Sequence, residues 1–427
     1  MCIRDRFGYD AERRKFFGPK TKRRVFLCSG RAAVVRGISP FVFLEQSGRS
    51  IPFFGAVRHI SKGAKSMNLQ KTTRSIQPLD KTAMEQAARR WDSIAKPLHS
   101  LGLLEETIIR AAGMQRTSRV SFSPRALLVF CADNGVVAQG VTQTDQSVTA
   151  IVTENFTKGK TSSCVMAEKA GVDLIPVDIG VSKPMEVPGL LQEKIRLGTD
   201  DFTLGPAMRR EEAVRAVETG IRLARQLANE GYRAIATGEM GIGNTTTSAA
   251  VVSVLLGYDP AEVTGVGAGL SSEGLVRKVE TIRRGIAVNR PNPDDALDVL
   301  SKVGGLDLAG IAGAFLGGAS AGIPVVIDGL ISAAAALIAV RLCPACAEYL
   351  LASHVSAEPA GQMLLDALGQ RAILHAGMCL GEGTGAVTLF PVLDLGLAVY
   401  EKMSSFSEIE LEPYTDFKKE EAQCSRL

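Results

Sequence analysis

Four short apolar segments, each followed by loop residues and then by a helical stretch, constrain the fold of this chain most. The segments are residues 126–132, 174–179, 234–236 and 322–327. Helical stretches that follow such segments include residues 211–229, 246–256 and 330–342. Strand, loop and helix in repetition predict an α/β fold, with a parallel sheet that helices cover on both faces.

Acidic residues stand at or just after the carboxyl ends of these predicted strands: Asp133, Asp178, Glu239 and Asp328. In an open α/β sheet, ligands bind at that edge. A helix N-cap is a common place for Asp and explains one or two of the four. Four acids at one edge therefore favour a binding or catalytic site.

Two runs embed an acid among glycines. Residues 380–386 read LGEGTGA around Glu382, and residues 238–248 read GEMGIGNTTTS around Glu239. Glycine lets a backbone adopt positive φ and approach a ligand closely. A carboxylate without polar partners in such a run would be desolvated, which suits a general base. One run alone fits a tight turn with a solvated Glu equally well, but two such runs indicate an active site.

The run 238–248 also predicts an anion site. Glycines and hydroxyl residues at a strand-to-helix junction leave backbone N–H groups free at a helix N-terminus. The run lacks the Lys-Thr or Lys-Ser of a Walker A loop, and a glycine-packed helix start is the alternative. A second glycine-rich segment, 265–270, precedes Lys278, whose ammonium could bind a phosphate. The glycines of 304–308 and 317–318 are interpreted as close-packed and structural.

Charge separates the first 66 residues from the rest. They carry 15 Lys and Arg against 4 Asp and Glu, so the remainder of the chain has a net charge of −7. We interpret residues 1–66 as a targeting peptide or an artefact that begins like a translated sequencing adapter, with Met67 as the true start. The remainder shows no basic stripe, which argues against nucleic acid as a partner, and we expect no membrane-spanning segment.

Eight cysteines are too few for a disulfide scaffold in a chain of 427 residues. Cys343 and Cys346 form a lone CxxC with His354 eight residues on. A zinc site needs a second ligand pair, so we interpret the motif as a helix start with two buried thiols, and we expect no metal.

Eight runs in order resemble the nicotinate-nucleotide–dimethylbenzimidazole phosphoribosyltransferase family, over roughly residues 68–405. They are residues 96–105, 132–136, 177–181, 238–247, 307–314, 325–333, 352–359 and 380–386. The resemblance implies a Rossmann-like parallel sheet flanked by helices, a small helical domain formed from both chain ends, and a homodimer. With the charge pattern, it leads us to expect a leader (1–66), an N-terminal helical part (67–125), a catalytic α/β domain (126–390) and a C-terminal helical part and tail (391–427).

The resemblance implies transfer of phosphoribose from nicotinate mononucleotide to 5,6-dimethylbenzimidazole, without a cofactor or metal. Glu382 is then the general base and Glu239 the assisting acid. The implied substrate-binding residues are Gly241, Gly243, Asn244, Thr245, Thr246, Lys278, Gly267, Asp328, Ser356, Gly381, Gly383 and Gln146.

The chain departs from the family pattern at three places. His99 stands where the family usually has Gly, Asn134 where it has His, and Thr144-Asp-Gln146 where an aromatic-Pro-Gln sequence is common. The last change leaves open another aromatic base, such as adenine, as acceptor. A nucleotide-binding regulator without catalysis is a further alternative, although retention of both acids argues against it. We expect a cytoplasmic protein, or an organellar one if residues 1–66 are a genuine leader.

Overall fold

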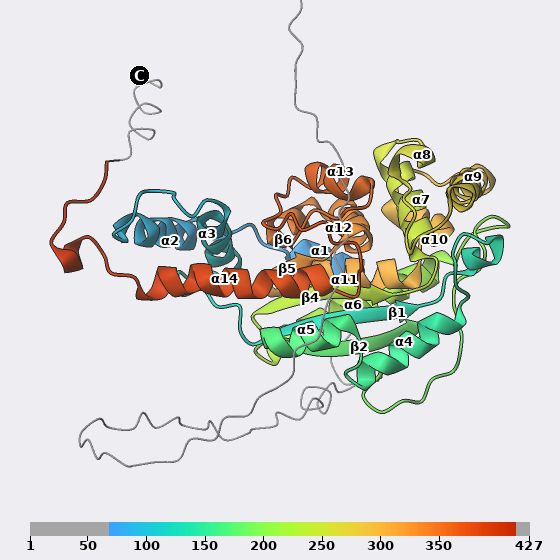
Figure 1. The fold of residues 1–427 in the computed structure, drawn as a ribbon, viewed down its shortest axis with the longest axis horizontal. Coiled ribbons are helices and arrows are strands. Elements are labelled where there is room, and N and C mark those ends of the chain that lie inside the picture. The colour runs from blue at the N-terminus through green and yellow to red at the C-terminus, as the bar shows by residue number, and fades with distance from the viewer. Residues whose placement is uncertain (1–67, 416–427) are drawn as a thin grey trace, which may run out of the picture. The chain divides into compact units, whose positions relative to one another are not determined.

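The computed structural model describes residues 68–415 and contains a six-stranded parallel sheet (Figure 1). The strands are β1 (Arg125–Ala132), β2 (Asp173–Gly180), β3 (Leu191–Gln192), β4 (Ala234–Met240), β5 (Val325–Ile327) and β6 (Leu350–Ala352). Their order, β3-β2-β1-β4-β5-β6, is the order of the Rossmann fold. The expected α/β sheet is confirmed, whereas the interpretation of residues 1–66 lies outside the described residues.

The four strands predicted from apolar segments are all present. All eight residues of β1 are buried, because this strand lies between β2 and β4 and is covered on both faces. The strands β3 and β6 were not predicted. With two and three residues they are too short to produce a recognisable sequence pattern.

Helices cover the sheet and form the ends of the described chain. They are α1 (Leu69–Ser75), α2 (Lys81–Ser93), α3 (Leu103–Gln115), α4 (Ser147–Thr157), α5 (Ser162–Ala170), α6 (Arg210–Asn229), α7 (Asn244–Leu256), α8 (Pro260–Val263), α9 (Ser272–Asn289), α10 (Ala296–Val303), α11 (Leu306–Ala321), α12 (Leu330–Leu342), α13 (Ala360–Ala367) and α14 (Thr384–Lys402), with the 3-10 helices η2 (Gly135–Gln139), η3 (Pro344–Tyr349) and η4 (Ser407–Ile409).

Glycines allow α11 to pack directly on α6. A Cβ on Gly313 would lie 1.9 Å from the carbonyl oxygen of Val217, and one on Gly317 would lie 2.6 Å from that of Ile221. These separations are well below van der Waals contact, so larger residues would push the helices apart. The structural interpretation of the glycines at 317–318 is confirmed.

The two ends of the described chain pack against each other (Figure 1). The rings of Trp91 in α2 and Tyr400 in α14 lie 5.2 Å apart, and Arg90 donates to the carbonyl oxygens of Tyr400 and Met403. The helix α2 ends at Ser93, because Ile94 is extended and bridges to Ser405. That the two ends form a separate small domain stays a prediction.

His99 adopts a left-handed conformation, with φ +57°. Gly, which the resemblance implies at this position, adopts this conformation without steric strain, whereas another L-residue is destabilised by roughly 1–2 kcal/mol. The side chain of His99 is exposed. The backbone at His99 is therefore strained, and the rest of the turn holds it in this conformation.

Of the described helices, α14 alone is long and apolar enough to cross a membrane by length and composition. Half of its apolar window is buried inside the protein, as is common for a core helix. It contacts α3, α5 and β4. Its apolar character is explained by this packing.

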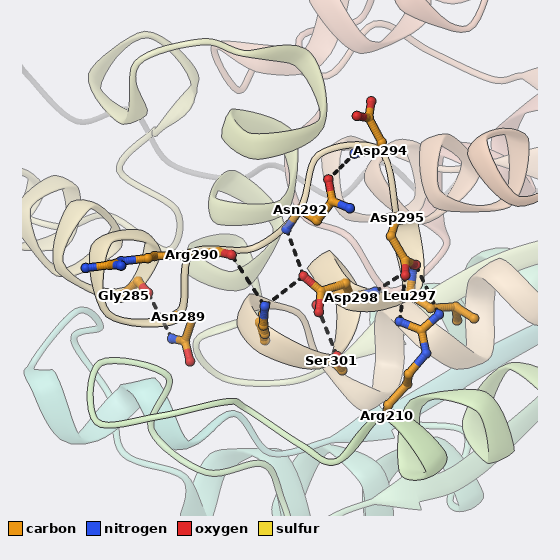
Figure 2. A network of polar contacts seen from close by, with 11 residues as sticks. Arg210, Gly285, Asn289, Arg290, Asn292, Asp294, Asp295, Leu297, Asp298 and Ser301 are labelled. Atoms are coloured by element: carbon orange, nitrogen blue, oxygen red, sulfur yellow. Dashed lines mark hydrogen bonds and ion pairs between the residues drawn. The ribbon is translucent and has the colours of Figure 1, made fainter.

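Figure 2 shows a polar network that joins the loop between α9 and α10 to α6. The N–H of Asn292 donates to Asp298 (2.7 Å), Asp295 caps α10, and Arg210 at the start of α6 pairs with Asp295 (2.8 Å). Lys278 lies on α9. The network therefore fixes the C-terminal end of the helix that carries this lysine.

The CxxC motif lies at the start of η3, and Cys343 and Cys346 are buried free thiols. Burial raises the pKa of the Cys346 thiol. Among residues 68–415, no group of three or more His, Cys, Asp and Glu side chains is arranged to hold a metal ion. The prediction of a helix start with two buried thiols is confirmed.

Candidate active site

A cavity of about 310 Å³ opens at the carboxyl ends of β4, β5 and β6. The segments that follow these strands line it, as do residues 141–144, 266–268 and 379–382. Glu239 and Asp328 reach it from two neighbouring strands. The other two strand-end acids do not line it, because Asp133 accepts hydrogen bonds from Ser182 and Asp178 pairs with Lys194. Two of the four strand-end acids therefore lie at the cavity, and the other two have structural contacts elsewhere.

The backbone around Glu382 is left-handed over three residues in succession. The φ angles are +85° at Gly381, +59° at Glu382 and +85° at Gly383. A Cβ at Gly381 would lie 2.3 Å from Oε1 of Glu239, and one at Gly383 would lie 2.4 Å from Leu127. The glycines therefore permit both the turn and the close approach to β4. Strain at a non-glycine residue is a feature that clusters at functional sites.

The half-buried side chain of Glu382 lines the cavity and contacts the first turn of α5. Its Oε2 accepts from the N–H and from the hydroxyl of Ser163, both at 3.3 Å. The expectation of a carboxylate without polar partners is therefore wrong. Donors at a helix N-terminus favour the negative charge. Long contacts of 3.3 Å leave the carboxylate able to accept a proton from a ligand.

Glu239 lies deeper, at 7% exposure. Burial, with the nearby Asp307 as a second cause, raises the pKa of Glu239 to about 8. The amide of Asn244 donates both to Glu239 and to Asp307, the latter at 3.0 Å. At neutral pH Glu239 is thus mainly a neutral acid, which can donate a hydrogen bond.

Asp328 is buried after β5, and its two carboxylate oxygens accept from the start of α14. The donors are the N–H groups of Gly383 (3.2 Å), Gly385 (2.7 Å) and Ala386 (3.0 Å). Burial raises the pKa of Asp328, and the nearby His354 opposes that rise. Asp328 ties the Glu382 turn to the sheet, a role that the sequence interpretation as a substrate-binding residue did not include.

Lys278 is 1% exposed, and its ammonium donates to Thr245 Oγ1 (2.9 Å) and to the carbonyl of Gly265 (3.0 Å). Burial lowers the pKa of Lys278 to about 8. A Cβ on Gly267 would lie 3.4 Å from the ammonium nitrogen. The structure thus brings together the two glycine-rich segments and the cation on the wall of the cavity.

The structure places all but three of the residues expected at the site along this cavity. Thr246 is buried within α7, and Gly383 packs under the turn. Gln146 lines two other cavities, and its amide donates to the carbonyl of Asn134 (3.1 Å).

Sequence reasoning missed several residues at or beside the cavity: Ser163, Asp307, His354 and Glu358. Two of them follow β6, a strand too short to detect. Asp307 belongs to the run 304–308, whose glycines were interpreted as structural. The run 352–359, which resembles the family, was the available signal for His354 and Glu358.

Comparison with known proteins gives the family of this chain. The family described as phosphoribosyltransferase, DBI_PRT, matches residues 76–410. A nicotinate-nucleotide–dimethylbenzimidazole phosphoribosyltransferase of Ruminiclostridium cellulolyticum is 44% identical over 348 residues, which cover 82% of this chain and 99% of the relative. The protein of the same name from Escherichia coli is 42% identical over 334 residues, 78% of this chain and 93% of the relative.

A solved structure has the same fold. The nicotinate-nucleotide–dimethylbenzimidazole phosphoribosyltransferase of Thermus thermophilus superposes with a TM-score of 0.74 at 39% identity, covering 78% of this chain and 99% of that chain. The match with the family extends over most of the chain and includes every segment that lines the cavity. The chain therefore belongs to the nicotinate-nucleotide–dimethylbenzimidazole phosphoribosyltransferase family.

Proposed function

We propose that this protein transfers the phosphoribosyl group of nicotinate mononucleotide to 5,6-dimethylbenzimidazole, giving α-ribazole 5′-phosphate and nicotinate, in the assembly of the cobalamin nucleotide loop. The relatives' names support both substrates. One observation carries the proposal: the buried ammonium of Lys278 and two carboxyl groups, those of Glu239 and Glu382, line one cavity.

The donor phosphate is placed at Lys278, Thr245 and the glycine-rich backbone around Gly267, because these groups offer a cation and donors to an anion. The glycosidic bond then points toward the two acids. Its ribose C1′ is bonded to a positively charged pyridine nitrogen. Cleavage neutralises that nitrogen, so nicotinate leaves readily. Carboxylate charge near C1′ stabilises the oxocarbenium character of the transition state.

The acceptor attacks C1′ with its basic ring nitrogen while its other nitrogen carries a proton. As the new bond forms, this N–H becomes acidic and Glu382 accepts its proton. Attack on the face opposite to nicotinate converts the β-nucleotide into an α-nucleotide. Glu239, neutral at physiological pH, acts as a hydrogen-bond donor at the wall of the cavity rather than as a second base.

Incubation of the protein with nicotinate mononucleotide and 5,6-dimethylbenzimidazole tests the proposal. We expect release of nicotinate in equal amount to a new nucleotide, whose α configuration is assigned by NMR. Release of nicotinate without a ribosylated base would indicate hydrolysis. No release with any aromatic base would exclude the transferase and leave a nucleotide-binding regulator.

A second acceptor is considered because Thr144 lines the cavity and departs from the family pattern. Thr144 stands where the resemblance implies an aromatic residue, and its neighbours Thr142 and Gln143 are polar as well. Such a wall favours a base with more hydrogen-bonding groups, such as adenine. A panel of bases at fixed donor concentration decides between them, by the ratio of kcat/KM for adenine to that for 5,6-dimethylbenzimidazole.

The proposal includes a homodimer in the bacterial cytoplasm. Support for self-association comes from large apolar side chains on the surface, among them Leu204 (83% exposed), Leu395 (68%) and Val165 (62%). The bacterial sources of the relatives support the location. Light scattering coupled to size-exclusion chromatography tests the dimer, since a mass equal to that of one chain would contradict it.

A further inference from the structure

Glu358 lies in the same cavity and has no part in the chemistry described above. It follows β6, and its Oε2 is buried without a hydrogen-bond partner among the described residues. A buried carboxylate oxygen without a donor is destabilising. A bound ligand that donates hydrogen bonds would relieve this penalty.

Glu358 lies close to the proposed phosphate site at Lys278. A Cβ on Gly265 would lie 1.8 Å from Oε2 of Glu358, so the carboxylate packs directly on this glycine. The carbonyl of the same glycine accepts from the ammonium of Lys278 (3.0 Å). The carboxylate of Glu358 therefore lies near the ammonium of Lys278, and Glu358 is one of the residues that line the same cavity.

Few groups of the two substrates can donate a hydrogen bond to the carboxylate of Glu358. A phosphate and the carboxylate of nicotinate are anions, and a second anion repels them. The single N–H of 5,6-dimethylbenzimidazole is the proton that Glu382 accepts. The ribose 2′ and 3′ hydroxyls remain, and carboxylates commonly bind the ribose of nucleotides in this way.

We propose that Glu358 accepts a hydrogen bond from a ribose hydroxyl of the nucleotide donor and so selects ribonucleotides. This inference rests on the proposed function for the identity of the donor. The phosphate at Lys278 and the hydroxyl at Glu358 together fix the sugar at two points, which holds C1′ at the carboxyl groups of Glu239 and Glu382.

The test compares three donors: nicotinate mononucleotide and its 2′-deoxy and 3′-deoxy analogues. Each is assayed with 5,6-dimethylbenzimidazole on the unaltered protein, on Glu358→Gln and on Glu358→Ala, with Glu401→Gln as the matched control. Glu401 is an exposed acid on α14 outside the cavity. Thermal melting of each variant checks folding.

We expect the unaltered protein to have a kcat/KM about 10- to 100-fold lower for one of the deoxy donors than for the ribonucleotide, as for loss of a hydrogen bond to a charged group. Glu358→Gln and Glu358→Ala should lower kcat/KM for the ribonucleotide by a similar factor, mainly through KM. With that deoxy donor, the variants and the unaltered protein should be nearly equal. Glu401→Gln should behave like the unaltered protein.

Two results would overturn the inference. The first is equal use of all three donors by the unaltered protein, a comparison that needs no variant. The second is an equal effect of Glu358→Gln on all three donors, which would assign Glu358 to the charge state of Lys278 instead of to the sugar.

Calorimetric titration of the same donors without acceptor separates this inference from the proposed function. If binding prefers the ribonucleotide, and this preference depends on Glu358, but no transfer occurs, only the proposed transferase function is contradicted. Transfer without that preference would contradict the role of Glu358 alone.

Discussion

The substitution Glu239→Gln tests the electrostatics of the site most directly. In the folded protein the pKa of Glu239 is raised from 4.5 to about 8 by burial and by Asp307. The folded state therefore holds a proton that the unfolded chain releases, and stability falls as pH rises between these two values. At about 1.4 kcal/mol per pKa unit, the full penalty above pH 8 is on the order of 5 kcal/mol.

Gln has the shape of the protonated acid and cannot ionise, and its oxygen can accept from the amide of Asn244 as Glu239 does. We expect the free energy of unfolding of Glu239→Gln to exceed that of the unaltered protein at pH 9 by several kcal/mol. At pH 5 the two should differ by less than about 1 kcal/mol, since Glu239 is then protonated in the folded state.

Urea unfolding followed by circular dichroism at a series of pH values between 5 and 9 measures this difference. Glu401→Gln, the same substitution at an exposed position on α14, is the control. A difference between Glu239→Gln and the unaltered protein that stays constant over this range would refute the argument that Glu239 is desolvated.

The remaining predictions concern turnover, donor binding and the strained turn. Glu382→Gln should lower kcat by about two or more orders of magnitude, as loss of a general base does, with unchanged thermal melting; near-normal turnover would remove Glu382 from the mechanism. Lys278→Ala should raise KM for nicotinate mononucleotide with a smaller effect on kcat, and an unchanged donor KM would count against the phosphate role. In the unaltered protein, the affinity for the donor should fall above pH 8, because Lys278 loses its charge there. His99→Gly should stabilise the fold by up to about 1 kcal/mol in urea unfolding, because it relieves a positive φ at an exposed position; destabilisation would show that contacts of the His99 side chain outweigh the strain.

The sequence alone determined the sheet and the location of its active edge. The buried strands β1, β2, β4 and β5 are marked by apolar segments long enough to recognise, and helices follow them. Glu239 and Glu382 could also be found from the sequence, because an acid within a glycine-rich run is a local pattern and the glycines are needed for positive φ.

Tertiary structure alone decided which polar residues share the cavity and in what state. Asp307, which raises the pKa of Glu239, lies 68 positions from it in the sequence, whereas Asn244, which donates to Glu239, lies only 5 positions away. Ser163, which donates to Glu382, lies 219 positions from it. Asp328 turned out to tie α14 to the sheet, while Asp133 and Asp178 bond elsewhere. Burial and contacts between distant segments set the charge of each group, and neither is a local property of the chain.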